Sequence, residues 1–504
     1  MKKNSVLAVL ALFVGISSIL LFAYVPTFVF STAAQSSFSP YNIDVLSQQT
    51  ICSGEVILPD KTELDGADPS FDPMPEKPHL QTIVNTSGPV IYGSLFNLDE
   101  TQSQDLNQSD INYLSTTDKK PKLFATAFDN ASNTMGAAGV SSSYITKGDL
   151  KGLAVDNCQK PTMDNWLIGG NTNIKSSPVL VINNSSASAG TANLDVYTNN
   201  SLNRPIDYSA TKSIAVPAHS QKRVLLSAGA LNQAALAVHV KFYGAAMTSL
   251  IQYSELDGIT PKGVDFIKPV VQSNEQIISG ISIKDNFSVE LSALALNNTS
   301  ASIEFIKTAN DKLKAVSQPE VSKKLDISLN KAQVNLSEIS GLTAGNYMVK
   351  VQAADPLITS VKVTNKNGNE SDLAFFTPSV ASNNTVAIIP SNLKSDIIIY
   401  PQSQSAEADF VVSLYGDNGK IISQNHYNLL ANQPYHFSES NINNQSKQLN
   451  KPVQFVFINS QSYNTKIFAG SSLSMANKQN EYFISGEVFT NLDTSTQTVY
   501  LQNN

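Results

Sequence analysis

Charged residues are scarce in this chain, at 15% of its 504 residues, and they leave a net charge of −7. Binding of DNA or RNA needs clustered lysine and arginine to neutralise phosphates, so this composition excludes a nucleic-acid partner. The hydrophobic share is an ordinary 41%, which excludes wholesale disorder. A chain of this length is expected to hold about three or four domains.

Residue types that are common in catalytic and ligand-binding sites are also rare: the chain has five histidines and a single tryptophan. No histidine lies at ligand spacing from a cysteine, and the sequence has neither a G-x-S-x-G nucleophile elbow nor a phosphate-binding glycine loop. We therefore predict that the protein is not an enzyme, with no catalytic, cofactor-binding or metal-binding residues and no cofactor. His239 alternates within an apolar run, and we interpret it as a histidine of a sheet.

Only two cysteines occur, Cys52 and Cys158. An even count in an exported chain predicts one disulfide between them, with two separate buried thiols as the alternative. In the chain-entropy model, a disulfide that closes a loop of roughly 100 residues stabilises the fold by about 4–5 kcal/mol.

An apolar segment opens the sequence: Lys2 and Lys3 precede residues 5–30, which carry no charge. A helix that crosses a bilayer takes about 20 apolar residues, and the two lysines would stay on the cytoplasmic side. We expect residues 1–34 to be a signal anchor, which places the protein in the cytoplasmic membrane as a single-pass protein with its bulk outside. A signal peptide cleaved after Ala34, which would leave the protein secreted, is the alternative.

Residues 35–80 read as an acidic, semi-rigid linker. Proline excludes regular helix and favours extended backbone, and it recurs here at Pro40, Pro59, Pro69, Pro73, Pro75 and Pro78.

Beyond residue 80 the chain consists of short alternating runs such as Val179–Ile182 and Val411–Tyr415, separated by Asn, Gly, Asp and Ser. Such alternation is typical of strands with one buried face. The turn Asp417-Asn418-Gly419 predicts a hairpin, because Asn-Gly readily takes positive φ. The predicted fold class is all-β, with tandem immunoglobulin-like β-sandwich modules after one N-terminal transmembrane helix.

Internal repetition divides this region. The phrase at 274–280 (NEQIISG) resembles that at 480–486 (NEYFISG), and 167–170 (LIGG) holds the same place in an earlier copy. A glycine fixed after apolar residues indicates a bulge or a close approach of another backbone. We predict an N-terminal β region at 81–157 and three β-sandwich modules at 158–268, 269–369 and 370–504.

One motif suggests a family. Cys158 is followed by Trp166-Leu167-Ile168-Gly169-Gly170, with 149–153 (DLKGL) before it, 180–184 (LVINN) after it and 261–266 (PKGVDF) further on. Together these resemble an uncharacterised actinobacterial family of secreted or membrane-anchored proteins, domain of unknown function 5719. The resemblance implies location and architecture, and it marks Trp166, Gly169 and Gly170 as a structural motif. We expect Trp166 to pack against the disulfide, with sugar stacking as the alternative.

The leading functional hypothesis is a non-enzymatic, extracytoplasmic structural or interaction protein of the cell envelope, tethered to the membrane by its N-terminal helix. Its expected partners are a cell-wall polymer or an envelope protein, bound through loops or sheet edges. A cell-wall glycan-acting enzyme, which would need two carboxylates about 5–10 Å apart in a cleft, and a surface adhesin are the alternatives.

Overall fold

The computed structural model describes fourteen parts of the chain: residues 38–43, 47–58, 74–87, 90–101, 103–106, 111–128, 136–207, 213–308, 320–437, 452–462, 464–475, 479, 482–492 and 497–502. Strands dominate them, which confirms the predicted all-β class. Four β-sandwich modules lie in the compact unit formed by residues 40–500. Outside the modules, β1 (Phe38–Ile43) and β34 (Gln497–Gln502) form a two-stranded sheet.

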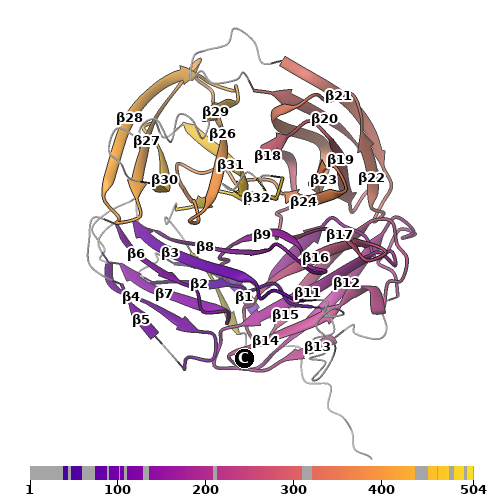
Figure 1. Ribbon diagram of the computed structural model, residues 1–504, viewed down its shortest axis with the longest axis horizontal. Coiled ribbons are helices and arrows are strands. Elements are labelled where there is room, and N and C mark those ends of the chain that lie inside the picture. Colours follow the sequence, from indigo (N-terminus) through magenta and orange to yellow (C-terminus); the bar gives the residue numbers. More distant parts are fainter. Residues whose placement is uncertain are drawn as a thin grey trace, which may run out of the picture. The chain divides into compact units, whose positions relative to one another are not determined.

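Module 1 spans residues 47–157 and consists of two four-stranded sheets, β2-β7-β4-β5 and β6-β3-β8-β9 (Figure 1). Its strands are β2 (Ser47–Cys52), β3 (His79–Ser87), β4 (Val90–Asn97), β5 (Ser103–Asp105), β6 (Asn112–Thr116), β7 (Lys122–Phe128), β8 (Gly136–Ile145) and β9 (Gly152–Asn157).

Module 2 spans residues 164–267 and repeats this order strand for strand, as β10-β15-β12-β13 and β14-β11-β16-β17. A short 3-10 helix, η3 (Leu226–Ala228), follows β14. The strands are β10 (Asp164–Ile168), β11 (Ser176–Asn184), β12 (Gly190–Thr198), β13 (Ser213–Val216), β14 (Ser220–Leu225), β15 (Leu236–Tyr243), β16 (Thr248–Asp257) and β17 (Thr260–Ile267).

Module 3 spans residues 273–376 and differs because one long strand, β23, serves both sheets. The first half of β23 pairs with β18 and β20, and the second half pairs with β19 and β24. The strands are β18 (Ser273–Ile283), β19 (Phe287–Ala295), β20 (Thr299–Lys307), β21 (Glu320–Leu329), β22 (Asn335–Ile339), β23 (Gly345–Asn367) and β24 (Glu370–Phe376).

Module 4 spans residues 384–491 and returns to two separate sheets, β28-β27-β30-β25-β33 and β29-β26-β31-β32. Its strands are β25 (Asn384–Ile388), β26 (Leu393–Ser403), β27 (Glu407–Gly416), β28 (Ile421–Leu430), β29 (Tyr435–Phe437), β30 (Val453–Ser460), β31 (Thr465–Met475), β32 (Ile484–Val488) and β33 (Thr490–Asn491).

Each module encloses its own core because successive side chains of a strand point to opposite faces. Along β12, buried and half-buried residues alternate as the sequence pattern predicts. The core of module 2 combines Leu194 and Val238 of one sheet with Leu180 and Ile251 of the other. The two sheets are therefore packed face to face as a sandwich.

The linker prediction for residues 35–80 is wrong for residues 47–52. These residues form β2, which pairs with β7 along its whole length and buries Ile51 and Cys52. The prolines of the segment start to cluster only at Pro59, after this strand has ended. The proline content of the segment as a whole is therefore no guide to the structure of β2.

The predicted signal anchor or signal peptide, residues 1–34, lies outside the described residues. Within the parts of the chain that the structure describes, no helix is long and apolar enough to cross a membrane. This finding contradicts the predicted single-pass location in the cytoplasmic membrane, and that prediction is withdrawn.

Two of the repeated glycines lie where another backbone approaches closely, one of the two outcomes that the repeated phrases predict. A Cβ at Gly280 would overlap the backbone of Gly470 and Ser471 in module 4. A Cβ at Gly486 would overlap the carbonyl oxygen of Phe375 in module 3. Both glycines therefore allow backbone of one module to lie directly on backbone of another.

We expect Gly280→Ala to lower the free energy of unfolding by about 2–4 kcal/mol, because overpacking adds to the strain of a positive φ. The matched control is Gly341→Ala, since Gly341 has nearly the same φ, +82° against +84°, but open space around the missing Cβ. Urea unfolding measures both variants. If both variants lost the same free energy of unfolding, the close approach of the module 4 backbone to Gly280 would not be the cause.

Candidate functional site

Four equivalent strands meet where the modules join. These closing strands, β9, β17, β24 and β32, each end the second sheet of their module, and they contact one another in the cyclic order β9, β17, β24, β32 (Figure 1). Each carries one carboxylate that is buried from solvent, and the four are Asp156, Asp265, Asp372 and Glu487. Burying an ionised carboxylate is costly unless hydrogen bonds and charges compensate, so the partners of these groups determine what the junction does.

Asp372 joins all four modules. Its Oδ2 accepts hydrogen bonds from the backbone N–H of Leu153 in module 1 and of Ile484 in module 4, both at 3.0 Å. Its Oδ1 accepts the N–H of Val264 in module 2 at 3.3 Å. Gly152 and Gly263 permit this approach, since a Cβ on either would collide with Oδ1. One side chain of module 3 thus satisfies backbone donors of the other three modules.

Asp265 and Glu487 extend the network. Asp265 accepts the N–H of Phe375 at 2.7 Å and the hydroxyl of Ser485 at 2.7 Å, which ties module 2 to modules 3 and 4. Ser485 Oγ in turn accepts the N–H of Val155 in module 1 at 3.1 Å. Glu487 accepts the hydroxyl of Ser471 at 2.9 Å and the N–H of Ile388 at 3.3 Å, both within module 4.

In the part of the chain that the structure describes, one buried cation, Lys268, faces these acids. The Lys268 ammonium donates to the carbonyl oxygen of Gly486 and lowers the pKa of Asp156, Asp265 and Glu487. Burial outweighs this effect: it raises the pKa of Asp156 and of Asp265 to about 6, and that of Glu487 to about 7. Burial also raises the pKa of Asp372 well above its usual value, against the lowering effect of the N–H groups bound to it.

A second ion cluster, built on the buried Lys362, joins modules 2 and 3. The Lys362 ammonium lies 2.7 Å from Glu255 Oε1 and 3.3 Å from Glu290 Oε2. Tyr253 donates its hydroxyl to Glu255 at 2.5 Å, and burial together with this carboxylate raises the tyrosine pKa well above its usual value. Because both carboxylates are bound to Lys362, this cluster also contributes to the contact between modules.

The predicted disulfide between Cys52 and Cys158 is confirmed. It connects β2 to the residue that follows β9, and both cysteines are buried in module 1 beside Val84 and Phe124.

Trp166 is buried, but the expectation that it packs against the disulfide is wrong. Its ring stacks on His239 at a centroid distance of 3.9 Å, and it shares a cluster with Leu294 and Ile358 of module 3. The reason is that Trp166 lies on the face of β10 that contacts module 3, whereas the disulfide lies inside module 1.

The two glycines of the motif also lie at packing contacts. A Cβ at Gly169 would collide with the ring of Phe375 in module 3, and a Cβ at Gly170 with the ring of Tyr253. The motif thus shapes the contact between modules 2 and 3.

His239 lies in β15, as the alternation predicts, and its Nε2 is 2.7 Å from Asp164 Oδ2. Stacking on Trp166 covers one face of the imidazole. His239 is therefore held between a carboxylate and an indole at the surface of the sheet.

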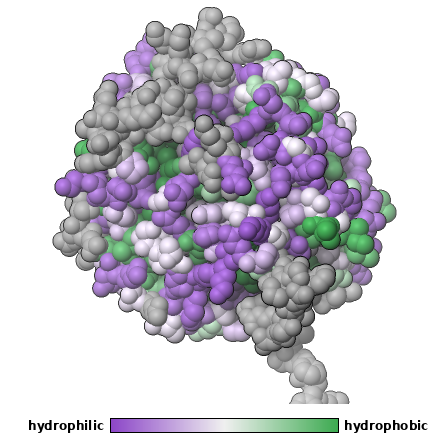
Figure 2. Space-filling model, viewed as in Figure 1, coloured by the Kyte–Doolittle hydropathy of each residue, from purple (hydrophilic) through white to green (hydrophobic). Residues whose placement is uncertain are grey.

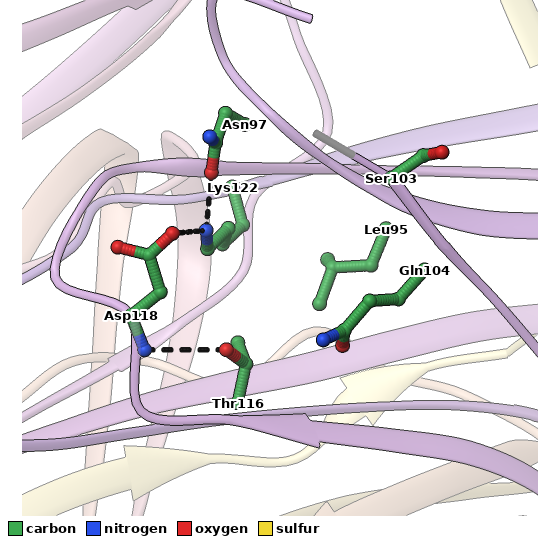
Figure 3. Close-up of a pocket in the computed structure, with 7 residues that line it drawn as sticks. All are labelled: Leu95, Asn97, Ser103, Gln104, Thr116, Asp118 and Lys122. Carbon is green, nitrogen blue, oxygen red and sulfur yellow. Dashed lines mark hydrogen bonds and ion pairs between the residues drawn. The ribbon is translucent and has the colours of Figure 1, made fainter. Parts of the chain in front are cut away.

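Module 1 contains a small polar pocket of about 70 Å³ between β4, β5 and the loop before β7 (Figure 3). The ammonium of Lys122 donates to Asn97 and lies 2.5 Å from Asp118 Oδ2. The lining residues are Leu95, Asn97, Ser103, Gln104, Thr116, Asp118 and Lys122. Among the residues that the structure describes, no group of histidine, cysteine and acidic side chains could hold a metal ion.

Sequence reasoning missed the four carboxylates, although a signal exists. Each stands inside an otherwise apolar or small-residue run of a closing strand, as in 152–156 (GLAVD), 263–266 (GVDF) and 371–376 (SDLAFF). An acid inside a strand that is buried on both faces needs a partner. Comparing the last strand of each repeat would have found this pattern.

Comparison with known proteins adds a family and little else. Residues 114–436, well over half of the chain, match the family of unknown function (DUF5719). No curated protein matches.

Two solved structures show only faint likeness. An α-L-rhamnosidase of Streptomyces avermitilis is 7% identical with a TM-score of 0.13, over 82% of this chain and 54% of that one. The FN1–FN3 domains of chicken CNTN1 are 9% identical with a TM-score of 0.08, over 68% of this chain and 99% of that one. This chain thus spans about half the length of the rhamnosidase, and scores this low support no inference about fold or function.

The motif around Trp166 and the match over residues 114–436 agree with each other. The chain belongs to the family of unknown function DUF5719.

Proposed function

We propose that this protein is a non-enzymatic, extracytoplasmic interaction protein of the cell envelope. In this role it holds four β-sandwiches in fixed mutual orientation and presents their loops to a cell-wall polymer or an envelope protein. The observation that carries the proposal is Asp372, whose carboxylate binds backbone N–H groups of the three other modules. A shared hydrogen-bond acceptor of this kind favours one arrangement of the modules over independent motion. The disulfide is in keeping with an oxidising compartment.

Exposed aliphatic side chains on neighbouring loops support binding of a partner. Four loops at one end of module 2 each expose one residue: Ile174 at 97%, Ile259 at 94%, Leu202 at 82% and Leu231 at 73%. Single exposed apolar residues are ordinary, so it is the position of these four on adjoining loops at one end of the module that supports a role in binding. Figure 2 shows hydrophobic residues among hydrophilic ones at the edge of module 2.

These loops are joined to one another. The backbone N–H of Thr172 donates to the carbonyl oxygen of Gln233, and the side chain of Asn199 accepts the N–H of Ala234. Lys175 forms an ion pair with Asp257 at 2.6 Å. We call this surface, defined by Ile174, Leu202, Leu231 and Ile259, the module 2 apolar tip. Its loops are pre-ordered, which lowers the entropic cost of binding.

We also propose that the modules are immunoglobulin-like in their central strands. In module 1, β3 pairs with β6 and β4 pairs with β7, as strands B with E and C with F do in an immunoglobulin domain. The first strand, β2, pairs with β7, and β8 pairs with β3, so the outer strands differ from that plan. The repeat of this order in the other modules supports a common ancestry for all four.

Co-sedimentation with an insoluble cell-wall preparation, together with an assay for released reducing ends, tests the function. We expect binding without glycan cleavage. The double variant Ile174→Ser/Ile259→Ser should bind at least tenfold more weakly, because burying one such side chain contributes about 1.5–3 kcal/mol. Ile421→Ser, at a half-exposed position of β28 in module 4, is the matched control. Release of reducing ends would refute the non-enzymatic assignment, and unchanged binding by the double variant would refute the role of the tip.

A further inference from the structure

Among the described residues, the closing-strand junction buries four acids but only one lysine that faces them. Asp156, Asp265, Asp372 and Glu487 are buried there, and Lys268 is the buried cation that faces three of them. Like charges at one buried site disfavour simultaneous ionisation, and protons are the simplest way to remove the excess. We propose that the junction is a proton-binding site that holds the four modules together more tightly when Asp156, Asp265 and Glu487 are protonated, and less tightly when these three acids ionise.

Buried acceptor atoms without hydrogen-bond donors also indicate that the junction binds protons. The Asp156 carboxylate accepts hydrogen bonds from Ser53, but its Oδ2 atom is buried without a donor among the described residues. The same holds for Asn157 Oδ1 and Gln159 Oε1. Gln159 already donates its amide N–H to the other oxygen of Asp156, and Asn157 contacts Glu487. A protonated carboxyl group would supply the missing O–H donor, since it can donate where a carboxylate can only accept.

The charged groups around the junction determine which of its side chains change protonation state between pH 5 and pH 8. From the packed elements, the charged or titratable groups that face these acids are Lys268 after β17, Asp372 of β24 and Tyr482 before β32. At the rim, Lys151 lies 2.5 Å from Glu370 and 5.9 Å from the centre of the Tyr482 ring. The pKa values of Lys151 and Tyr482 are both raised from ordinary values that already lie at about 10. The change between pH 5 and pH 8 is therefore assigned to the buried acids.

The raised pKa values determine whether the junction becomes more or less stable as pH rises. Asp156 and Asp265 titrate at about 6 and Glu487 at about 7 in the folded protein, above the ordinary value of about 4 for a free carboxyl group. A raised pKa means that the folded junction binds protons more tightly than the unfolded chain does. Its contribution to stability is therefore complete below about pH 4 and is lost as pH rises through 6 to 7.

Hydrogen exchange of the full chain between pH 5 and pH 8, corrected for intrinsic exchange rates, tests the proposal. The amides of Leu153, Phe375 and Ile484 donate to the junction, and we expect their protection to fall at least tenfold from pH 5 to pH 8. The amide of Leu194, in the core of module 2, is the internal reference. Unchanged protection at the junction, or greater protection at pH 8, would overturn the proposal.

Variants that resemble the protonated state provide the second arm. Asp265→Asn/Glu487→Gln keeps the side-chain shapes and removes two charges, so we expect its junction amides to stay protected at pH 8. Asp326→Asn, at an exposed position of β21, is the control and should follow the parent protein. Equal loss of protection in the parent and the double variant would contradict the assignment to these acids. If the double variant does not fold, the parent protein alone still shows whether protection of the junction amides falls or rises from pH 5 to pH 8.

Discussion

Asp372→Ala is expected to lower the free energy of unfolding by about 3–6 kcal/mol and to increase cleavage between modules in limited proteolysis. The change removes the acceptor of three buried N–H groups, those of Leu153, Val264 and Ile484. A buried donor left without a partner costs about 1–3 kcal/mol. Urea unfolding measures the loss, and mass spectrometry of the fragments locates the cleavage.

Two further variants separate this effect from a general effect of losing an acid. Asp326→Ala changes an exposed aspartate of β21 and should alter stability by less than about 0.5 kcal/mol. Asp372→Asn keeps one oxygen acceptor, so its loss in the free energy of unfolding should lie between those of Asp372→Ala and Asp326→Ala. A loss below about 1 kcal/mol for Asp372→Ala would show that the N–H groups find other partners and that the modules do not depend on this carboxylate.

Removal of the disulfide is the second large effect. Cys52 and Cys158 are 106 residues apart in the sequence, so the bond closes a long loop of the unfolded chain. We expect Cys52→Ala/Cys158→Ala to lower the free energy of unfolding by about 4–5 kcal/mol, in line with the chain-entropy value for such a loop. Urea unfolding with and without a reducing agent provides the measurement.

The double variant carries its own control, because a reducing agent should destabilise the parent and leave the variant unchanged. In the native parent the buried bond should resist reduction until the module opens, since thiol–disulfide exchange requires access to the sulfur. A difference between parent and variant below about 1 kcal/mol would mean that residual structure in the unfolded chain already restricts the loop.

Local patterns of the sequence predicted local structure well. The alternating runs at 179–182 and 411–415 lie in β11 and β27, and the turn at Asp417-Asn418-Gly419 joins β27 to β28 with Gly419 at a φ of 68°. The disulfide was predictable because two cysteines allow only one intramolecular pairing. These inferences succeed because strand alternation and turn chemistry depend on residues that are close in sequence.

Contacts between distant residues were not predictable in the same way. The sandwich in residues 47–157 was missed as such because β5 has only three residues and β2 lies beside a proline-rich stretch. The hydrogen bonds of Asp372 and Asp265 join residues of different modules that are more than 100 positions apart in the sequence. Which strand ends meet depends on the packing of whole modules, and single-strand patterns carry no information about it.

The long reach of these bonds has a consequence for how the chain matures. The N–H of Leu153 can bind Asp372 only after a further 219 residues have been synthesised. The N–H of Val155 can bind Ser485 only after a further 330 residues. At a synthesis rate of about 5–20 residues per second, the first wait alone lasts on the order of 10–40 s. During that interval the edge of β9 is a nascent strand without its final neighbours, a state that invites pairing with other chains. Assistance from a chaperone should therefore improve the yield of native protein most while the second half of the polypeptide is being made.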